Sequence, residues 1–206
     1  MKYSLLIGAI FMSLTGYGQA WAKQFDHVDN CVCGLSLVEK NGKHGFVDKD
    51  GNLVVPLVYD EGLTFSEGYA AVKQNGKWGY LDSTGKVLVE PKYNEALSFH
   101  SGLAVVNENG RYGFINVTGK TTIGLIYENA LGFSEGLAAV NKGGNWGYIN
   151  ASGKEVIPFK YGFAGTFSGG TAKAMLNRKW VTIDQTGKKV ADNDEYTLSL
   201  HDALPI

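Results

Sequence analysis

The chain has no excess of charge of either sign, because 19 basic residues balance 20 acidic ones. A nucleic-acid binder needs a basic footprint, so this class of protein is excluded. Cysteine is limited to Cys31 and Cys33, and with the nearby His27 these are too few ligands for a metal site. No long apolar run follows residues 5–14, so we expect no membrane span in the mature chain.

Both ends of the chain carry segments that we set apart from the fold. Lys2, the apolar run 5–14 and the small residues of Ala20-Trp21-Ala22 predict a signal peptide over residues 1–22. We therefore expect a mature start at Lys23 and a periplasmic or secreted protein. Residues 196–206 read as the in-frame translation of a standard sequencing adapter, so we treat them as an artefact and expect the natural protein to continue past Glu195.

Glycine is abundant instead, and its spacing defines the architecture. Five glycines recur with a period of 34 residues, at positions 34, 68, 102, 136 and 170. A fixed period of this length is typical of stacked repeats. We divide the array, residues 23–195, into a half unit and five units: 23–33, 34–66, 67–100, 101–134, 135–168 and 169–195.

Each unit contains two tight turns. Asn75-Gly76 and its counterparts predict a type I′ hairpin, and Asp82 to Gly85 predicts a type I turn closed by a glycine. The segments around these turns predict three short strands in an antiparallel meander. Trp78 and Tyr80 then point to one face of the sheet, and Gly79 and Leu81 to the other. We expect an aromatic ring of an adjacent unit to approach Gly79.

A connector with the spacing Tyr-x-x-Ala-x-x-Phe follows each meander, as in Tyr93 to Phe99. This spacing predicts a single helical turn with its apolar residues on one side. Prolines such as Pro91 and Pro158 are expected to end the third strand. One unit cannot bury its own apolar face, so the units are expected to stack in an open solenoid-like array. A β-propeller is the alternative, which we disfavour because a propeller blade has four strands.

The phrase Gly-Leu-Ala-Ala-Val-x-x-x-Gly-x-Trp-Gly-Tyr-Ile at residues 136–149 resembles the WG repeat, also called the KWG repeat, of bacterial proteins. The segment Asn75 to Asp82 fits the same pattern, and the resemblance covers roughly residues 25–190. His44, Tyr112 and Val181 depart from the pattern. The resemblance implies an all-β repeat in exported or envelope-associated proteins. It implies no shared catalytic mechanism and no defined ligand.

One column of aromatic residues is a candidate ligand site. Its members, one period apart after His44, are Trp78, Tyr112, Trp146 and Trp180. If exposed, these rings would stack on successive sugars of a glycan. The alternative, which we favour, is that they pack between repeats and belong to the scaffold.

Cys31 and Cys33 are a candidate disulfide in an exported protein. On a strand their Cα atoms would lie about 6.5 Å apart, near the upper limit for a bridge. A local bridge, a cysteine partner beyond the given chain and free thiols all remain open.

No set of nucleophile, base and acid stands out, since His27, His44 and His100 fall in different units. We therefore predict no enzyme, no cofactor and no metal. The expected function is a non-catalytic binding or scaffolding surface in the bacterial cell envelope, facing a protein or a glycan. A hydrolase of cell-wall polymers, or the targeting part of a larger truncated enzyme, is the alternative.

Overall fold

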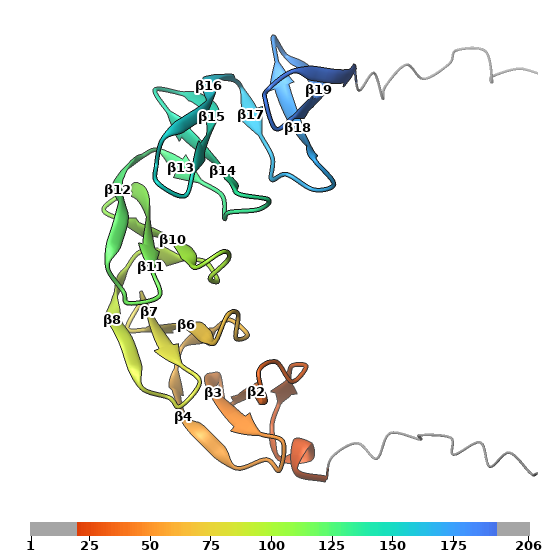
Figure 1. The fold of residues 1–206 in the computed structure, drawn as a ribbon. Helices are drawn as coiled ribbons and strands as arrows, with labels where there is room; N and C mark the ends of the chain where they lie inside the picture. The colour runs from red at the N-terminus through yellow and green to blue at the C-terminus, as the bar shows by residue number, and fades with distance from the viewer. Residues whose placement is uncertain (1–19, 193–206) are drawn as a thin grey trace, which may run out of the picture.

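The computed structural model describes residues 20–192, which form five antiparallel sheets of four strands (Figure 1). The described chain begins with the 3-10 helix η1 (Ala20–Gln24). Most of the predicted signal peptide (residues 1–19), the end of the fifth unit (193–195) and the suspected artefact (196–206) lie outside the described residues.

Every sheet has the same composition, a strand of two residues followed by three longer strands. Sheet 1 contains β1 (His27–Val28), β2 (Leu35–Lys40), β3 (Lys43–Asp48) and β4 (Leu53–Tyr59). Sheet 2 contains β5 (Glu61–Gly62), β6 (Tyr69–Gln74), β7 (Lys77–Asp82) and β8 (Val87–Tyr93). Sheet 3 contains β9 (Glu95–Ala96), β10 (Leu103–Glu108), β11 (Arg111–Asn116) and β12 (Thr121–Tyr127). Sheet 4 contains β13 (Asn129–Ala130), β14 (Leu137–Lys142), β15 (Asn145–Asn150) and β16 (Glu155–Tyr161). Sheet 5 contains β17 (Phe163–Ala164), β18 (Thr171–Leu176), β19 (Lys179–Asp184) and β20 (Lys189–Asp192).

The expectation of three strands per unit is wrong, because the connector contributes a fourth. The connector was expected to form a helical turn, but Glu61 and Gly62 are extended and pair with Lys73 and Val72 of β6. The backbone N–H of Leu63 continues this pairing and donates to the carbonyl of Ala71 at 2.9 Å. A single helical turn leaves its terminal N–H and C=O groups without partners, whereas the extended connector bonds to the neighbouring strand.

Both predicted turns are confirmed. Asn75 and Gly76 have φ of 51° and 76°, the two positive values that a type I′ hairpin requires. In the second turn Gly85 donates its N–H to the carbonyl of Asp82 at 2.9 Å, and the Asp82 carboxylate accepts the N–H groups of Thr84 and Lys86. The Asx side chain therefore closes the turn, as its spacing from the glycine predicts.

The glycine of the Trp-Gly pair faces backbone of its own sheet, so the prediction of an adjacent aromatic ring is wrong. A Cβ built on Gly79 would lie 2.4 Å from the carbonyl oxygen of Val89 and 2.8 Å from the nitrogen of Pro91, both in β8. The cause is a bulge: Trp78 pairs with Tyr93 but Tyr80 pairs with Val89. The extra residues of β8 fold over Gly79 and leave no room for a side chain there.

The prolines do not end the third strand, as was expected, but lie inside it. Pro56, Pro91 and Pro158 fall within β4, β8 and β16. These strands form the outer edges of their sheets, where proline is tolerated because one side of the strand needs no backbone donor.

The core lies between sheets, as the alternation of residues along β7 predicts. Trp78 and Tyr80 pack in one cluster with Ala104 and Val106 of sheet 3. Leu81, on the other face, packs in a cluster with Phe46 of sheet 1. Sheet 2 is therefore buried by both of its neighbours. In Figure 1 the sheets follow one another along an open arc, with β4, β8 and β12 on its convex side.

Polar contacts across the interfaces alternate along the arc. Tyr80 of sheet 2 donates its hydroxyl to the carbonyl of Leu97 in sheet 3 at 2.7 Å. Tyr148 of sheet 4 donates in the same way to the carbonyl of Gly165 in sheet 5 at 2.8 Å. The two other interfaces have phenylalanine at this position, namely Phe46 and Phe114.

A column of carboxylates follows the same alternation. Glu67 accepts the backbone N–H groups of Ser101 and Gly102 at 2.7 and 2.8 Å. Two units later, Glu135 accepts the N–H of Gly170 at 3.0 Å. The other members of this column, one period away from these glutamates, are Cys33, Ser101 and Gly169, none of which is a carboxylate. Sheets 2 and 3, and likewise sheets 4 and 5, are therefore joined by hydrogen bonds that the other interfaces lack among residues 20–192.

Candidate binding groove on the concave side

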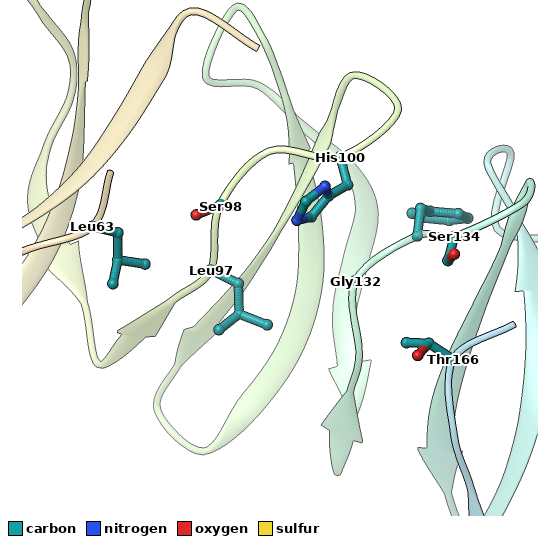
Figure 2. Close-up of a pocket in the computed structure, with 8 residues that line it drawn as sticks. Leu63, Leu97, Ser98, His100, Gly132, Ser134 and Thr166 are labelled. Atoms are coloured by element: carbon teal, nitrogen blue, oxygen red, sulfur yellow. The ribbon is translucent and has the colours of Figure 1, made fainter. Parts of the chain in front are cut away.

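The connectors lie on the side of the arc opposite to the outer strands, and a groove runs across four of them. Its volume is about 430 Å³, and it crosses sheets 2, 3, 4 and 5 (Figure 2). The residues that line it are Leu63, Leu97, Ser98, His100, Gly132, Phe133, Ser134 and Thr166. None of these side chains is a carboxylate, an ammonium or a guanidinium group.

The lining is built from the same repeat positions in successive units. Leu63 and Leu97 occupy one position, and Ser98, Gly132 and Thr166 occupy the next. The first two connectors present a leucine to the groove, whereas in the fourth connector Gly165 stands at this position. Leu97 has 42% of its surface exposed, which leaves this leucine open to a ligand.

Hydrogen bonds fix the backbone that carries the groove. Ser134 and Leu137 exchange backbone hydrogen bonds in both directions, at 2.9 and 3.0 Å, which closes the loop after the connector. The Ser134 hydroxyl donates to the carbonyl of Phe167 at 2.7 Å and joins the connectors of sheets 4 and 5. The imidazole of His100 lies over Gly132, where a Cβ would come within 3.6 Å of its Cδ2 atom. The groove is therefore part of an ordered framework.

The predicted aromatic column lies elsewhere, between sheets. Trp78 and Trp146 are buried, with 9% and 7% of their surfaces exposed. Tyr112 is half-buried and donates its hydroxyl to Glu95 at 2.8 Å, and burial together with this carboxylate raises the pKa of Tyr112. Trp180 is 42% exposed and packs edge-on against Phe163, with ring centres 5.6 Å apart. The four residues form no continuous exposed surface.

Cys31 and Cys33 are both exposed, and no disulfide bond joins them. Cys33 lies in a turn with a positive φ of 53°. Within residues 20–192 no three histidine, cysteine, aspartate or glutamate side chains gather as a metal site would require. No helix in this part of the chain is long and apolar enough to cross a membrane.

Sequence reasoning missed the groove because it assigned the connectors to the core. Tyr93 and Phe99 are indeed buried, but Leu97 and Ser98 between them face outward. A usable signal was present: a leucine followed by a small residue recurs at Leu63 and Leu97, outside the Tyr-x-x-Ala-x-x-Phe pattern.

The family of this chain follows from its repeats. The family described as WG containing repeat matches residues 45–78, 78–112, 112–146 and 146–180, well over half of the chain. This protein belongs to the WG repeat family. Each WG repeat match runs from one Trp-Gly position to the next, so the 34-residue period inferred from the glycines is confirmed. No curated protein matches the sequence.

Solved structures similar to this WG repeat protein include Hsv2p of Kluyveromyces lactis, with a TM-score of 0.51 and 12% identity over 85% of this chain and 66% of that one. A eukaryotic initiation factor matches with a TM-score of 0.51 and 11% identity over 81% of this chain and 56% of that one. The WG repeat chain therefore spans less than two thirds of either. Hsv2 is a β-propeller-like protein, and at this identity the likeness shows the fold alone. Four-stranded sheets remove our reason for disfavouring a propeller.

Proposed function

We propose that this WG repeat protein is a non-catalytic binding protein of the bacterial cell envelope, exported to the periplasm or beyond. Its ligand is an extended polypeptide segment that lies along the concave groove. The observation that carries the proposal is the groove itself, a hollow of about 430 Å³ that crosses four successive sheets and is lined by no carboxylate, ammonium or guanidinium group. Stacked repeats commonly offer such extended surfaces to a ligand. We further propose that the sheets remain an open, solenoid-like array, because an open arc keeps this surface accessible.

The spacing of the sheets supports an extended polypeptide. Packed sheets lie about 10 Å apart, and an extended chain rises about 3.3 Å per residue. A polyproline II segment turns once every three residues, over about 9 Å. Such a ligand places every third side chain on one face, so two successive side chains of that face could meet Leu63 and Leu97.

The chemistry of the lining supports a polypeptide over a glycan. Sugar stacking needs flat exposed rings, and Trp78 and Trp146 are buried between sheets. The groove instead offers the branched side chains of Leu63 and Leu97 and the hydroxyl groups of Ser98 and Thr166. These suit apolar side chains with a backbone running beside them.

The alternatives from the sequence are a cell-wall hydrolase and the targeting part of a larger enzyme. A hydrolase needs a base or nucleophile held by a partner. His100 lies in the groove near Ser98 and Ser134, yet no carboxylate lines this hollow. Non-catalytic binding is therefore our proposal for the array.

The test measures binding of two labelled peptides by fluorescence anisotropy. The first peptide is four Pro-Pro-Leu triplets, and the second has the same composition in scrambled order. We expect the first to bind and the second to bind at least about tenfold more weakly. Leu97→Asp places a charge in the groove and should weaken binding by about tenfold or more.

The matched control is Leu53→Asp, since Leu53 is 52% exposed on β4 at the convex edge. This variant should bind like the unchanged protein. Equal binding of both peptides, or equal effects of the two substitutions, would overturn the proposal. Binding of soluble peptidoglycan fragments that displaces no peptide would assign the surface to a glycan instead, and their turnover would favour the hydrolase.

A further inference from the structure

The turn glycine of each unit packs against the sheet before it. A Cβ built on Gly119 would lie 2.8 Å from Cγ2 of Val89, and one built on Gly187 would lie 2.7 Å from Cγ2 of Ile157. In the repeat register the packing residue is always the same, namely Val55, Val89, Ile123 and Ile157. One apolar side chain per unit thus covers the turn of the next unit.

At the first turn this position is taken by Trp21. A Cβ built on Gly51 would lie 2.3 Å from Cγ of the Trp21 ring. Trp21 stands one period of 34 residues before Val55, and Phe25 stands one period before Tyr59. The indole N–H of Trp21 donates to the carbonyl of Lys49 at 3.3 Å, and its ring meets Phe25 edge-on at 6.1 Å. The half-buried Trp21 therefore takes, at the first turn, the place that a valine or isoleucine of the preceding sheet takes at the later turns.

The outer face of sheet 1 is apolar. Val38 and Val47 are fully buried there, one period before Val72 and Leu81, which face the preceding sheet in unit 2. Terminal repeats of a stack need a cap for such a face. Cleavage after Ala22, as the sequence first predicted, would remove Trp21 from this position.

A second small-x-small triplet, Gly18-Gln19-Ala20, ends directly before Trp21. We propose that the leader peptidase of the host cuts here, and that the mature chain begins with Trp21 as its N-terminal cap. Water adds across the Ala20–Trp21 peptide bond, which leaves a carboxyl group on Ala20 and a free amino group on Trp21. This inference rests on the export that we propose above, and it is independent of the ligand in the groove.

The test expresses the full chain with its own leader in a bacterial host and determines the mature N-terminus by intact mass and N-terminal sequencing. We expect Trp21 as the first residue. Ala22→Leu should leave this N-terminus unchanged, and Ala20→Leu should block or move the cut. A mature start at Lys23 overturns the inference while export stands, whereas an unprocessed intracellular chain overturns both.

The cap is tested on the processed protein. Trp21→Ala should lower its melting temperature measurably, and Lys23→Ala, which changes an exposed side chain of η1, should not. Identical melting of the two variants would overturn the capping role, even with Trp21 as the first residue.

Discussion

The Trp-Gly glycine offers the sharpest test of the fold, and sheet 3 supplies a matched pair of glycines for it. A Cβ built on Gly113 would lie 2.6 Å from the carbonyl oxygen of Ile123 and 2.7 Å from that of Gly124. A carbon and a carbonyl oxygen usually come no closer than about 3.3 Å. Gly113→Ala therefore requires the backbone of β12 to move by roughly 0.7 Å.

The expected cost follows from what this movement disturbs. Tyr112 pairs with Tyr127 and Phe114 pairs with Ile123, so the shifted segment lies between two anchored pairs. Overpacking of a filled core costs about 1–3 kcal/mol, and backbone cannot turn aside as a side chain can. We expect a loss of about 3 kcal/mol in the free energy of unfolding. At about 2–4 °C per kcal/mol, the melting temperature falls by roughly 6–12 °C.

The control is Gly124→Ala in the adjacent strand. A Cβ there would meet only Cγ2 of Ile126, at an ordinary 3.7 Å, and Gly124 has no positive φ. This change should be neutral or stabilise the protein by up to about 1 kcal/mol. Both variants are compared by urea unfolding followed by circular dichroism. Coinciding unfolding curves would refute the bulge as the reason for glycine.

Three further predictions concern side chains at the interfaces and turns. Trp146→Ala should destabilise the protein by about 3–5 kcal/mol, because Trp146 is buried. Trp180→Ala should destabilise it by much less, because Trp180 is exposed. Thermal unfolding of the two variants measures the difference. Burial raises the pKa of Tyr148, so the stability that its neutral hydroxyl supplies is present below about pH 10 and lost at higher pH. In Tyr148→Phe the free energy of unfolding, measured by urea unfolding, should therefore fall less steeply as the pH rises. The hydrogen bond from the Thr84 hydroxyl lowers the pKa of Asp82, so the ionised carboxylate contributes to stability above about pH 4, and this contribution is lost on acidification. In Asp82→Asn the free energy of unfolding should therefore fall less steeply as the pH is lowered below about 4. An unchanged slope would contradict this.

The repeat period and the faces of the strands could be predicted from the sequence because both depend on local spacing. Alternation along residues 78–81 assigned Tyr80 and Leu81 to opposite interfaces, and the Asn-Gly pairs located the hairpins. These features are decided within one unit, where a strand period of two residues leaves a clear pattern.

The fourth strand could not be predicted in this way. Glu61 and Gly62 are too few for any alternation to appear, and their pairing is decided by β6, which lies further along the chain. The bulge over Gly79 was missed for a related reason, since the register of β8 against β7 shifts between two apparently regular strands. Where Val181 replaces glycine, it pairs directly with Asp192, and Thr182 pairs with Ala191. Of the two shifts seen in the other sheets, the described part of sheet 5 has only the second, between Thr182 and Ile183.

The groove was missed because the connectors were expected to be helical turns whose Tyr, Ala and Phe side chains join the core, and the leucines between them were not considered. Once β9 is placed at the inner edge of its sheet, Leu97 must face outward beyond it. Prediction of this groove therefore depends on the edge strand, which the sequence does not reveal.

The alternating carboxylates limit how such a protein lengthens or shortens over generations. Loss of a single copy, unit 3 for example, would place Glu67 directly against the hairpin tip that carries Glu135, two like charges at one junction. Loss or duplication of two copies at once preserves the order of charged and uncharged tips.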